Sequence, residues 1–180
     1  MSDLVARTGR HQQRYEGGCR LVAGCIPFRY KDLDDDNSSK SNKIIEVLMI
    51  TSQSGPGLLF PKGGWENDET VEEAALREAL EEAGVRGELK EFLGYYEFRS
   101  KTHQDEFCPE GLCRAAMFPL LVTEELVSWP EQSTRLRRWV SLTEAVEQCR
   151  HPWMQEALAE GFSIWQANQI MCVEDDSDPT

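Results

Sequence analysis

The chain has 180 residues, 40% of them hydrophobic, and a formal net charge of −13 at pH 7. This length suits one domain with short extensions, and the apolar fraction is sufficient for a buried core. Nucleic acid and anionic membranes bind to positively charged surfaces, which so acidic a chain does not provide overall. We therefore expect neither of them as a partner. We expect a monomer that acts on a small molecule, and a polyanionic substrate would have to meet a local basic patch or a bound metal ion.

The six cysteines could pair as disulfides, but the sequence has no long apolar run and no secretory signal. We therefore expect reduced thiols and a cytoplasmic protein. Residues 1–17 are polar and contain arginines, which leaves a weak mitochondrial presequence as the alternative to a flexible arm. A zinc site at Cys108 and Cys113, near His103, lacks a fourth ligand at a fitting spacing, so a loop followed by a strand is the preferred interpretation.

The first third of the chain predicts three extended segments. Residues 20–30 form an apolar run in which Pro27 indicates an edge or a bulge, and residues 44–51 form a run strong enough for a central strand. The charged segment between them, 31–43, predicts a hairpin loop. After a turn, residues 58–60 resume an extended conformation.

A capped helix is predicted at 71–83. Thr70 followed by Glu73 is a capping-box pair, in which each side chain satisfies a backbone donor at the helix start. Gly84 supplies the left-handed position that ends a helix.

Three glutamates of this helix, Glu78, Glu81 and Glu82, stand at i, i+3 and i+4, which places their carboxylates on one face. Like charges at this spacing cost about a few tenths of a kcal/mol even when exposed. A solvated acidic surface is one interpretation. A site is the preferred one, because several hard carboxylate oxygens in one place suit Mg²⁺ or a similar cation. The other face is expected to pack through Leu76, Ala79, Leu80 and Ala83.

The second half of the chain predicts strands followed by helices. We expect a long bent strand at 87–99 and further strands at 112–123 and 135–140. Two helices should follow, one that begins at 141 and another that spans 153–165. The acidic C-terminus predicts disorder. The expected organisation is an arm at 1–17, one domain at 18–168 and a disordered tail at 169–180.

Gly63, Glu69 six residues later, and the run REALEEAGV at 77–85 together resemble a complete Nudix box. The resemblance covers residues 18–150 and implies an α+β fold, the Nudix α/β/α sandwich with a mixed β-sheet and a catalytic loop and helix at 63–85. Sequence pattern alone does not determine the strand order of such a sheet.

The resemblance also implies roles in hydrolysis of a pyrophosphate link. Glu78 and Glu82 would be the principal ligands of Mg²⁺ or Mn²⁺. Glu81 would be a further ligand or the base that takes the proton of the attacking water, and Gly63 would offer its carbonyl to the cation.

Three further residues near the box are candidates. Arg77 is expected to orient a box carboxylate through a charge-assisted contact, with a surface ion pair as the alternative. Glu69 belongs either to the site or to simple capping of the positive helix end. Glu66 is a second-rank candidate for contact with metal or water.

The runs PKGGWE at 61–66 and EEAGVRG at 81–87, with Trp129 and Trp139, resemble the plant-type members of the diphosphoinositol polyphosphate phosphohydrolase subfamily. These enzymes cleave the diphosphate of inositol pyrophosphates, and many also cleave diadenosine polyphosphates. An inositol ring crowded with phosphates needs clustered basic donors. The candidates are Arg14, Arg20, Lys62, Arg99, Lys101, Arg114, Arg135 and Arg137.

Two alternatives remain open. A hydrolase of diadenosine polyphosphates or other nucleoside diphosphate derivatives would have to stack a purine on Phe60, Trp65, Tyr95 or Tyr96. A Nudix-fold binding module without catalysis is disfavoured, because a pure binder would not need to maintain the repulsion of the acidic helix face.

Overall fold

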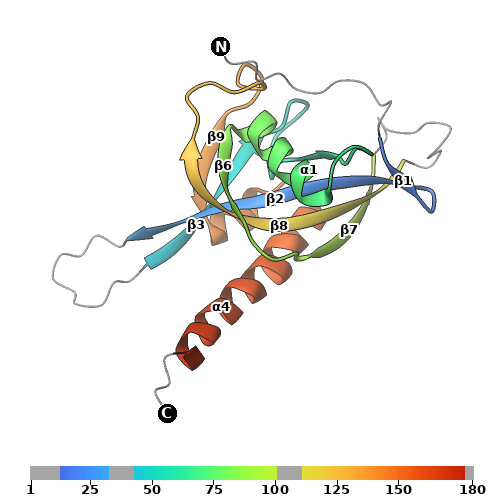
Figure 1. The fold of residues 1–180 in the computed structure, drawn as a ribbon. Helices are drawn as coiled ribbons and strands as arrows, with labels where there is room; N and C mark the ends of the chain where they lie inside the picture. The colour runs from blue at the N-terminus through green and yellow to red at the C-terminus, as the bar shows by residue number, and fades with distance from the viewer. Residues whose placement is uncertain (1–12, 33–42, 101–110, 177–180) are drawn as a thin grey trace.

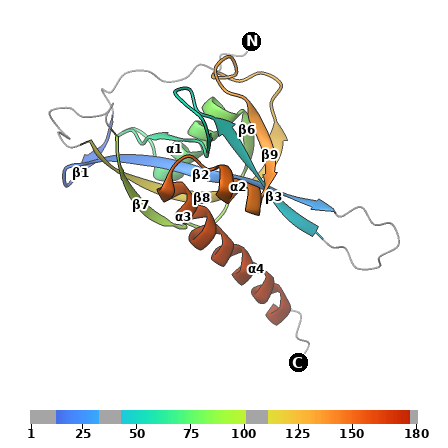
Figure 2. The same cartoon turned by 180° about the vertical axis from the view of Figure 1, so that it is seen from behind.

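A computed structural model of the protein describes residues 13–32, 43–100 and 111–176. Within these ranges a mixed sheet of nine strands lies between one helix on one face and a run of helices on the other (Figures 1 and 2). This arrangement confirms the expected α+β sandwich. In the part of the chain that the structure describes, no helix is long and apolar enough to cross a membrane.

The strands follow one another along the chain with the helices interspersed. They are β1 (Tyr15–Glu16), β2 (Cys19–Asp32), β3 (Lys43–Thr51), β4 (Leu58–Leu59), β5 (Lys62–Gly64), β6 (Val85–Leu89), β7 (Gly94–Arg99), β8 (Leu112–Glu125) and β9 (Arg137–Ser141). The helices are α1 (Val71–Glu78), the π-helical turn η1 (Ala79–Ala83), α2 (Leu142–Gln148), α3 (Pro152–Glu156), the π-helical segment η3 (Ala157–Phe162) and α4 (Ser163–Asp176). α1 covers one face of the sheet, and α2, α3 and the start of α4 cover the other (Figures 1 and 2).

The centre of the sheet is the parallel pair of β2 and β8. Arg20 to Phe28 pair in register with Cys113 to Leu121, and the remaining ladders between the described strands are antiparallel. Parallel strands covered on both faces are typically continuous apolar runs rather than alternating ones. Both strands have this character, and Val22, Ala23, Cys25 and Ile26 of β2 are all at most 1% exposed.

The expected long strand at 87–99 is corrected to two strands, β6 and β7. Both pair with β8, but the segment between them opposes Phe118 and Pro119, and Pro119 has no N–H to donate to a ladder. The carbonyl of Pro119 accepts a hydrogen bond from the Lys90 N–H instead. The bend expected from the sequence is therefore an interruption caused by the partner strand.

Both expected chain boundaries also differ from the structure. The arm was expected to extend to residue 17, yet Gln13 bridges Glu66 and β1 pairs with the start of β2. The tail was expected to begin at 169, yet α4 continues to Asp176 and extends away from the sheet in both views.

Candidate active site

β5 brings its two glycines against the inner side of α1 and the N-terminal segment. A Cβ atom on Gly63 would lie 2.2 Å from the carboxylate of Glu78, and one on Gly64 would lie 2.1 Å from Oε1 of Gln13. A side chain at either position would displace the end of its neighbour, the Glu78 carboxylate or the Gln13 amide. Gly63 thus makes room for a carboxylate of the Nudix-like helix.

The helix begins and ends as expected. The Thr70 hydroxyl accepts from the Glu73 N–H at 3.1 Å, and the Glu73 carboxylate accepts from the Thr70 N–H at 2.9 Å, which completes the capping box. Gly84 ends the helix with a φ of 68°. Both local predictions are confirmed.

The helix faces differ from the expectation. The last turn, η1, is π-helical, so its side chains are rotated relative to a regular α-helix. Glu78 and Glu81 are only 6% exposed, whereas Leu76, expected in the core, is 38% exposed. The acidic face therefore points into the protein, and packing on the sheet falls to Ala74, Ala75, Ala79 and Ala83.

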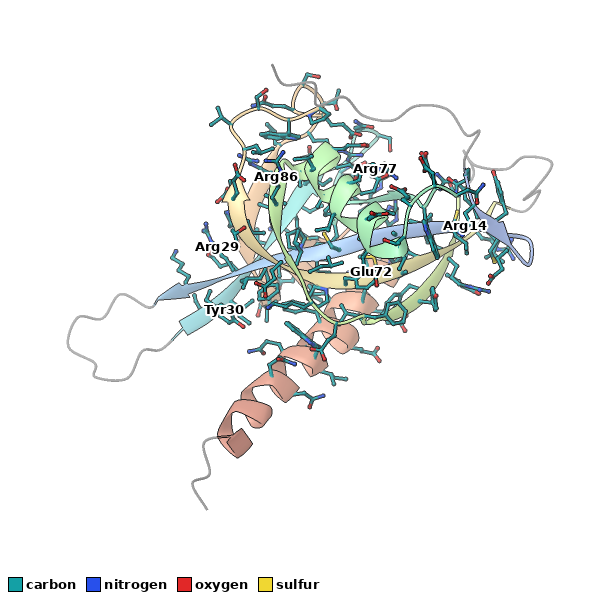
Figure 3. The ribbon with its side chains drawn as sticks, viewed as in Figure 1. Arg14, Arg29, Tyr30, Glu72, Arg77 and Arg86 are labelled. Carbon is teal, nitrogen blue, oxygen red and sulfur yellow. The ribbon has the colours of Figure 1, made fainter. Side chains whose placement is uncertain are left out.

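Arg77, which is labelled in Figure 3, binds three buried or nearly buried carboxylates at once. Its Nε and Nη2 donate to the two oxygens of Glu69 at 3.0 and 2.7 Å, and Nη1 donates to Glu78 at 2.9 Å and to Glu81 at 3.3 Å. Nη2 also donates to the carbonyl of Gly64 at 2.8 Å. Burial acts against the charge of Arg77, but the hydrogen bond to Glu69 and the charges of all three carboxylates together raise its pKa.

Glu69 links this network to the preceding loop. Its Oε1 accepts from the Glu66 N–H at 3.0 Å, and its carbonyl accepts from the Trp65 indole N–H at 2.9 Å. Its carboxylate is therefore engaged by Arg77 and the loop backbone. We assign Glu69 to holding the loop and helix together rather than to simple capping of the helix end.

Glu82 belongs to a second group of charges on the other side of the site. Its Oε1 accepts from the Lys62 backbone N–H at 3.2 Å, and its Oε2 lies 3.7 Å from the Arg135 guanidinium. Arg135 also donates to Glu131 at 2.8 Å and to the Thr51 carbonyl at 2.9 Å. Arg135 therefore joins the helix to the loop that precedes β9.

Burial and mutual repulsion disfavour the ionised forms of two of these carboxylates. Burial, then the charges of Glu82 and Glu81, raise the pKa of Glu78 well above its usual range, against the lowering effect of Arg77 and Lys62. Burial raises the pKa of Glu82 to about 7, and Glu131 adds to this effect while Lys62 and Arg135 oppose it. The site thus holds more negative charge than its neighbours neutralise.

The donor set suits a divalent cation. The two groups combine five carboxylates with three cationic side chains, an excess that a divalent ion would offset. Among the described residues, no three His, Cys, Asp or Glu side chains already form a metal-coordinating group. Arg77 and Arg135 hold several of the carboxylate oxygens instead, so binding of an ion would require small side-chain rearrangements.

A cleft of about 670 Å³ lies beside these carboxylates and is strongly basic. Arg20, Lys62, Arg99 and Arg135, four of the candidates for substrate binding, line it. Lys62 and Arg135 line the cleft and also lie next to the Glu82 carboxylate. The cleft is therefore connected to Glu82 through Lys62 and Arg135.

Two basic residues of the cleft, Arg150 and His151, were missed from the sequence. They follow α2 and reach the cleft because Cys149 forms a β-bridge with Leu58. Burial, followed by the charges of Lys62 and Arg150, lowers the pKa of His151. The only signal in the sequence was an Arg-His pair before Pro152, which is too short to indicate a site.

The other basic candidates lie elsewhere. Arg14 and Arg114 line a separate cavity of about 140 Å³, and Arg14 also donates to three loop carbonyls and stacks on Trp65. Arg137, also expected to bind substrate, does not line the cleft, and its guanidinium donates to the carbonyls of Ala83, Gly84 and Leu126. Lys101 lies outside the described residues, as do His103 and Cys108 of the zinc alternative.

Comparison with known proteins identifies the family. The NUDIX domain model matches residues 36–161. Nudix hydrolase 16, mitochondrial, from Arabidopsis thaliana is 69% identical over 171 residues, which cover 95% of each chain. Human diphosphoinositol polyphosphate phosphohydrolase 3-alpha is 33% identical over 170 residues, 90% of this chain and 92% of the relative.

Among solved structures, a Caenorhabditis elegans Ap4A hydrolase binary complex matches with a TM-score of 0.57 at 20% identity. The match covers 82% of this chain and 98% of that one, and at this identity it shows the fold alone. Nudix hydrolases generally need divalent metal ions, which agrees with the excess of carboxylates in the site. The chain belongs to the Nudix family and is a Nudix hydrolase.

Proposed function

We propose that this Nudix hydrolase cleaves the diphosphate bond of diphosphoinositol polyphosphates with the help of Mg²⁺ or Mn²⁺. The observation that carries the proposal is the basic cleft directly beside the buried carboxylates. In a chain with a net charge of −13, six basic side chains around one cleft are a local reversal of charge. A substrate dense in phosphates explains such a reversal.

The carboxylates of the helix have different roles in the proposed reaction. Glu78 and Glu82 are the principal metal ligands, with Glu81 as a ligand or as the base for the attacking water and the Gly63 carbonyl as a further ligand. A bound divalent cation would lower the pKa of a water and neutralise charge on a phosphoryl oxygen. Arg77 is a positioning residue, because it holds three carboxylates from one guanidinium.

The basic residues of the cleft bind the phosphates that do not react. Arg20 lines the cleft, and its Nε has no hydrogen-bond partner among the described residues. A phosphate oxygen would supply the missing acceptor. Arg99, Arg150 and His151 line the same cleft and extend the binding surface.

The aromatic rings near the site favour inositol phosphates over nucleotides. Phe60 is 1% exposed, and Trp65 and Tyr95 belong to the walls of the smaller cavity. The rings that do line the cleft, Phe98 and Trp153, stack on each other at 4.8 Å, and the Lys62 ammonium lies over the ring of Phe98. A purine would have to displace one of these contacts in order to stack.

The 33%-identical human relative is named a diphosphoinositol polyphosphate phosphohydrolase, which supports the same substrate class. The plant relative has "mitochondrial" in its name, which supports the mitochondrial alternative over the cytoplasm. A fluorescent protein fused to the C-terminus tests the location. Signal confined to the cytosol would contradict a mitochondrial enzyme.

The test of substrate class combines Arg20→Gln with Lys62→Gln and compares turnover of an inositol pyrophosphate and a diadenosine polyphosphate. Arg138→Gln is the matched control, because Arg138 is 50% exposed and its ion pair in the described part of the chain is with Glu144, away from the cleft. We expect the double variant to lose at least about tenfold more activity on the inositol pyrophosphate, since several phosphates lose a partner. Equal losses on both substrates would refute the ranking of the inositol pyrophosphate above the dinucleotide.

A further inference from the structure

The last turn of the catalytic helix has backbone carbonyls that the helix itself does not satisfy. The four final carbonyls of any helix lack intrahelical partners and need donors from elsewhere. Here those carbonyls belong to Glu81, Glu82, Ala83 and Gly84, so two of them belong to glutamates of the acidic site. The backbone at two of these carbonyls therefore carries the side chains of Glu81 and Glu82.

One distant segment, residues 126–137, supplies donors to all four carbonyls. The Glu131 N–H bonds to the Glu81 carbonyl at 3.0 Å, and the Trp129 indole N–H bonds to the Glu82 carbonyl at 3.2 Å. Nη1 of Arg137 bonds to the carbonyls of Ala83 and Gly84, both at 3.0 Å. We name this segment the helix-end clamp.

Trp129 and Arg137 form the rigid part of the clamp. The Arg137 guanidinium lies 4.0 Å from the centroid of the Trp129 ring. The ring in turn packs on Gly84, where a Cβ atom would lie 2.5 Å from Trp129 Cδ2. A cation at this position also interacts favourably with the negative end of the helix.

The same segment also holds a side chain of the site. Arg135 lies 3.7 Å from the Glu82 carboxylate and is itself fixed by Glu131. Glu82 is thus held at its carbonyl by Trp129 and at its carboxylate by Arg135. A shift of the clamp would move both ends of this one residue.

We propose that the helix-end clamp positions Glu81 and Glu82 for metal binding and hydrolysis, with Trp129 and Arg137 as positioning residues. This inference rests on the proposed metal-binding role of the two glutamates, but not on the identity of the substrate. Displacements of about 1 Å remote from the reacting atoms can cost about 100-fold in rate, so loss of one clamp hydrogen bond has a measurable effect.

The chain offers a matched pair of tryptophans for the test. Trp129→Phe removes the N–H that binds the Glu82 carbonyl and keeps a ring beneath Arg137. Trp139→Phe is the control, because the Trp139 ring lies beneath Arg29 at 4.1 Å, while its buried Nε1 has no acceptor in the described structure. Each variant is titrated with Mn²⁺ by calorimetry and assayed for kcat and KM on the substrate that the wild-type protein cleaves best.

For Trp129→Phe we expect Mn²⁺ to bind about tenfold more weakly and kcat to fall about tenfold, with KM changed less than about twofold. Trp139→Phe is expected to match the wild type in all three quantities. A second series keeps the charge at position 137. Arg137→Lys should retain more Mn²⁺ affinity than Arg137→Gln, since the lysine still places a cation at the helix end.

Equal Mn²⁺ affinity and kcat in the two tryptophan variants would overturn the proposal. A lower melting temperature of Trp129→Phe with unchanged Mn²⁺ binding would also overturn it, because that result describes a purely structural contact. If the wild-type protein cleaves no inositol pyrophosphate, the substrate proposal fails, and the Mn²⁺ titrations still decide the role of the clamp.

Discussion

Glu82→Gln is the substitution that tests whether the acidic site is maintained at a cost in stability. The pKa of Glu82 lies at about 7 in the folded protein against an ordinary value of 4.5, chiefly because of burial. The folded chain therefore retains a proton that the unfolded chain has lost between these two pH values. Stability falls as pH rises through this window, and the full penalty of about 3 kcal/mol is present above pH 7.

The glutamine variant removes this penalty. The amide oxygen can still accept from the Lys62 N–H, and the pKa of about 7 already contains the favourable charge of Arg135 at 3.7 Å. In the absence of metal at pH 8 we expect the variant to be more stable than the wild type by about 3 kcal/mol, or about 9 °C in Tm. The difference should fall below about 1 kcal/mol near pH 5, where the wild-type carboxyl is protonated in the folded chain and still partly protonated in the unfolded chain. Mg²⁺-dependent turnover should be lost at every pH.

The assay is urea unfolding in the presence of a chelator at pH 5 and pH 8, together with turnover in Mg²⁺. Glu124→Gln is the control, because Glu124 is 53% exposed and pairs only loosely with Arg86 at 3.7 Å. It should leave both stability and turnover close to wild type. A Glu82→Gln variant that is less stable than the wild type at pH 8, or that still turns over substrate with Mg²⁺, would refute the reasoning.

Three other outcomes follow from the same contacts. Arg77→Lys is expected to destabilise the protein by about 3 kcal/mol or more in chemical denaturation. A lysine cannot maintain the paired contact with Glu69 and leaves buried carboxylates uncompensated. An effect below about 1 kcal/mol would contradict this expectation. Gly63→Ala should abolish turnover, because its Cβ would displace the Glu78 carboxylate, and an active variant would show that Glu78 is not needed where it lies. Mg²⁺ should raise the Tm more at pH 8 than at pH 5, since protons compete with the ion for Glu78 and Glu82, and a larger rise at pH 5 would argue against these ligands.

The ends of the helix formed by α1 and η1 were predictable because their signals are local. Thr70, Glu73 and Gly84 act within one turn of their own positions, and the structure has both caps. The orientation of the helix was harder to predict. Leu76 faces solvent and Glu78 lies against Gly63, although both belong to the regular helix α1, and the π-helical turn that follows changes the angles of the side chains from Ala79 onward.

The basic residues show what a single sequence leaves open. Arg135 and Arg137 are two positions apart, yet Arg135 borders the cleft and Arg137 bonds to the end of the catalytic helix. Their separate roles depend on contacts with Glu82 and Gly84, which lie more than 50 residues earlier in the chain. Charge alone does not distinguish a ligand for substrate from a partner for backbone carbonyls.

The break between β6 and β7 has a similar origin. Residues 87–99 themselves contain enough apolar positions for one strand, and the interruption arises opposite Pro119 on β8. Arg150 and His151 were missed for a comparable reason, because a bridge between Leu58 and Cys149 carries them to the cleft. In each case the deciding residue is distant in sequence.

The most direct test of the proposed substrate is a side-by-side turnover assay of the wild-type protein. Purified protein with Mg²⁺ is given an inositol pyrophosphate and a diadenosine polyphosphate at matched concentrations, and kcat/KM is measured for both. The basic cleft beside the acidic helix predicts at least about tenfold higher kcat/KM for the inositol pyrophosphate. Equal values, or a preference for the dinucleotide, would contradict the assignment of the cleft to a phosphate-crowded ring.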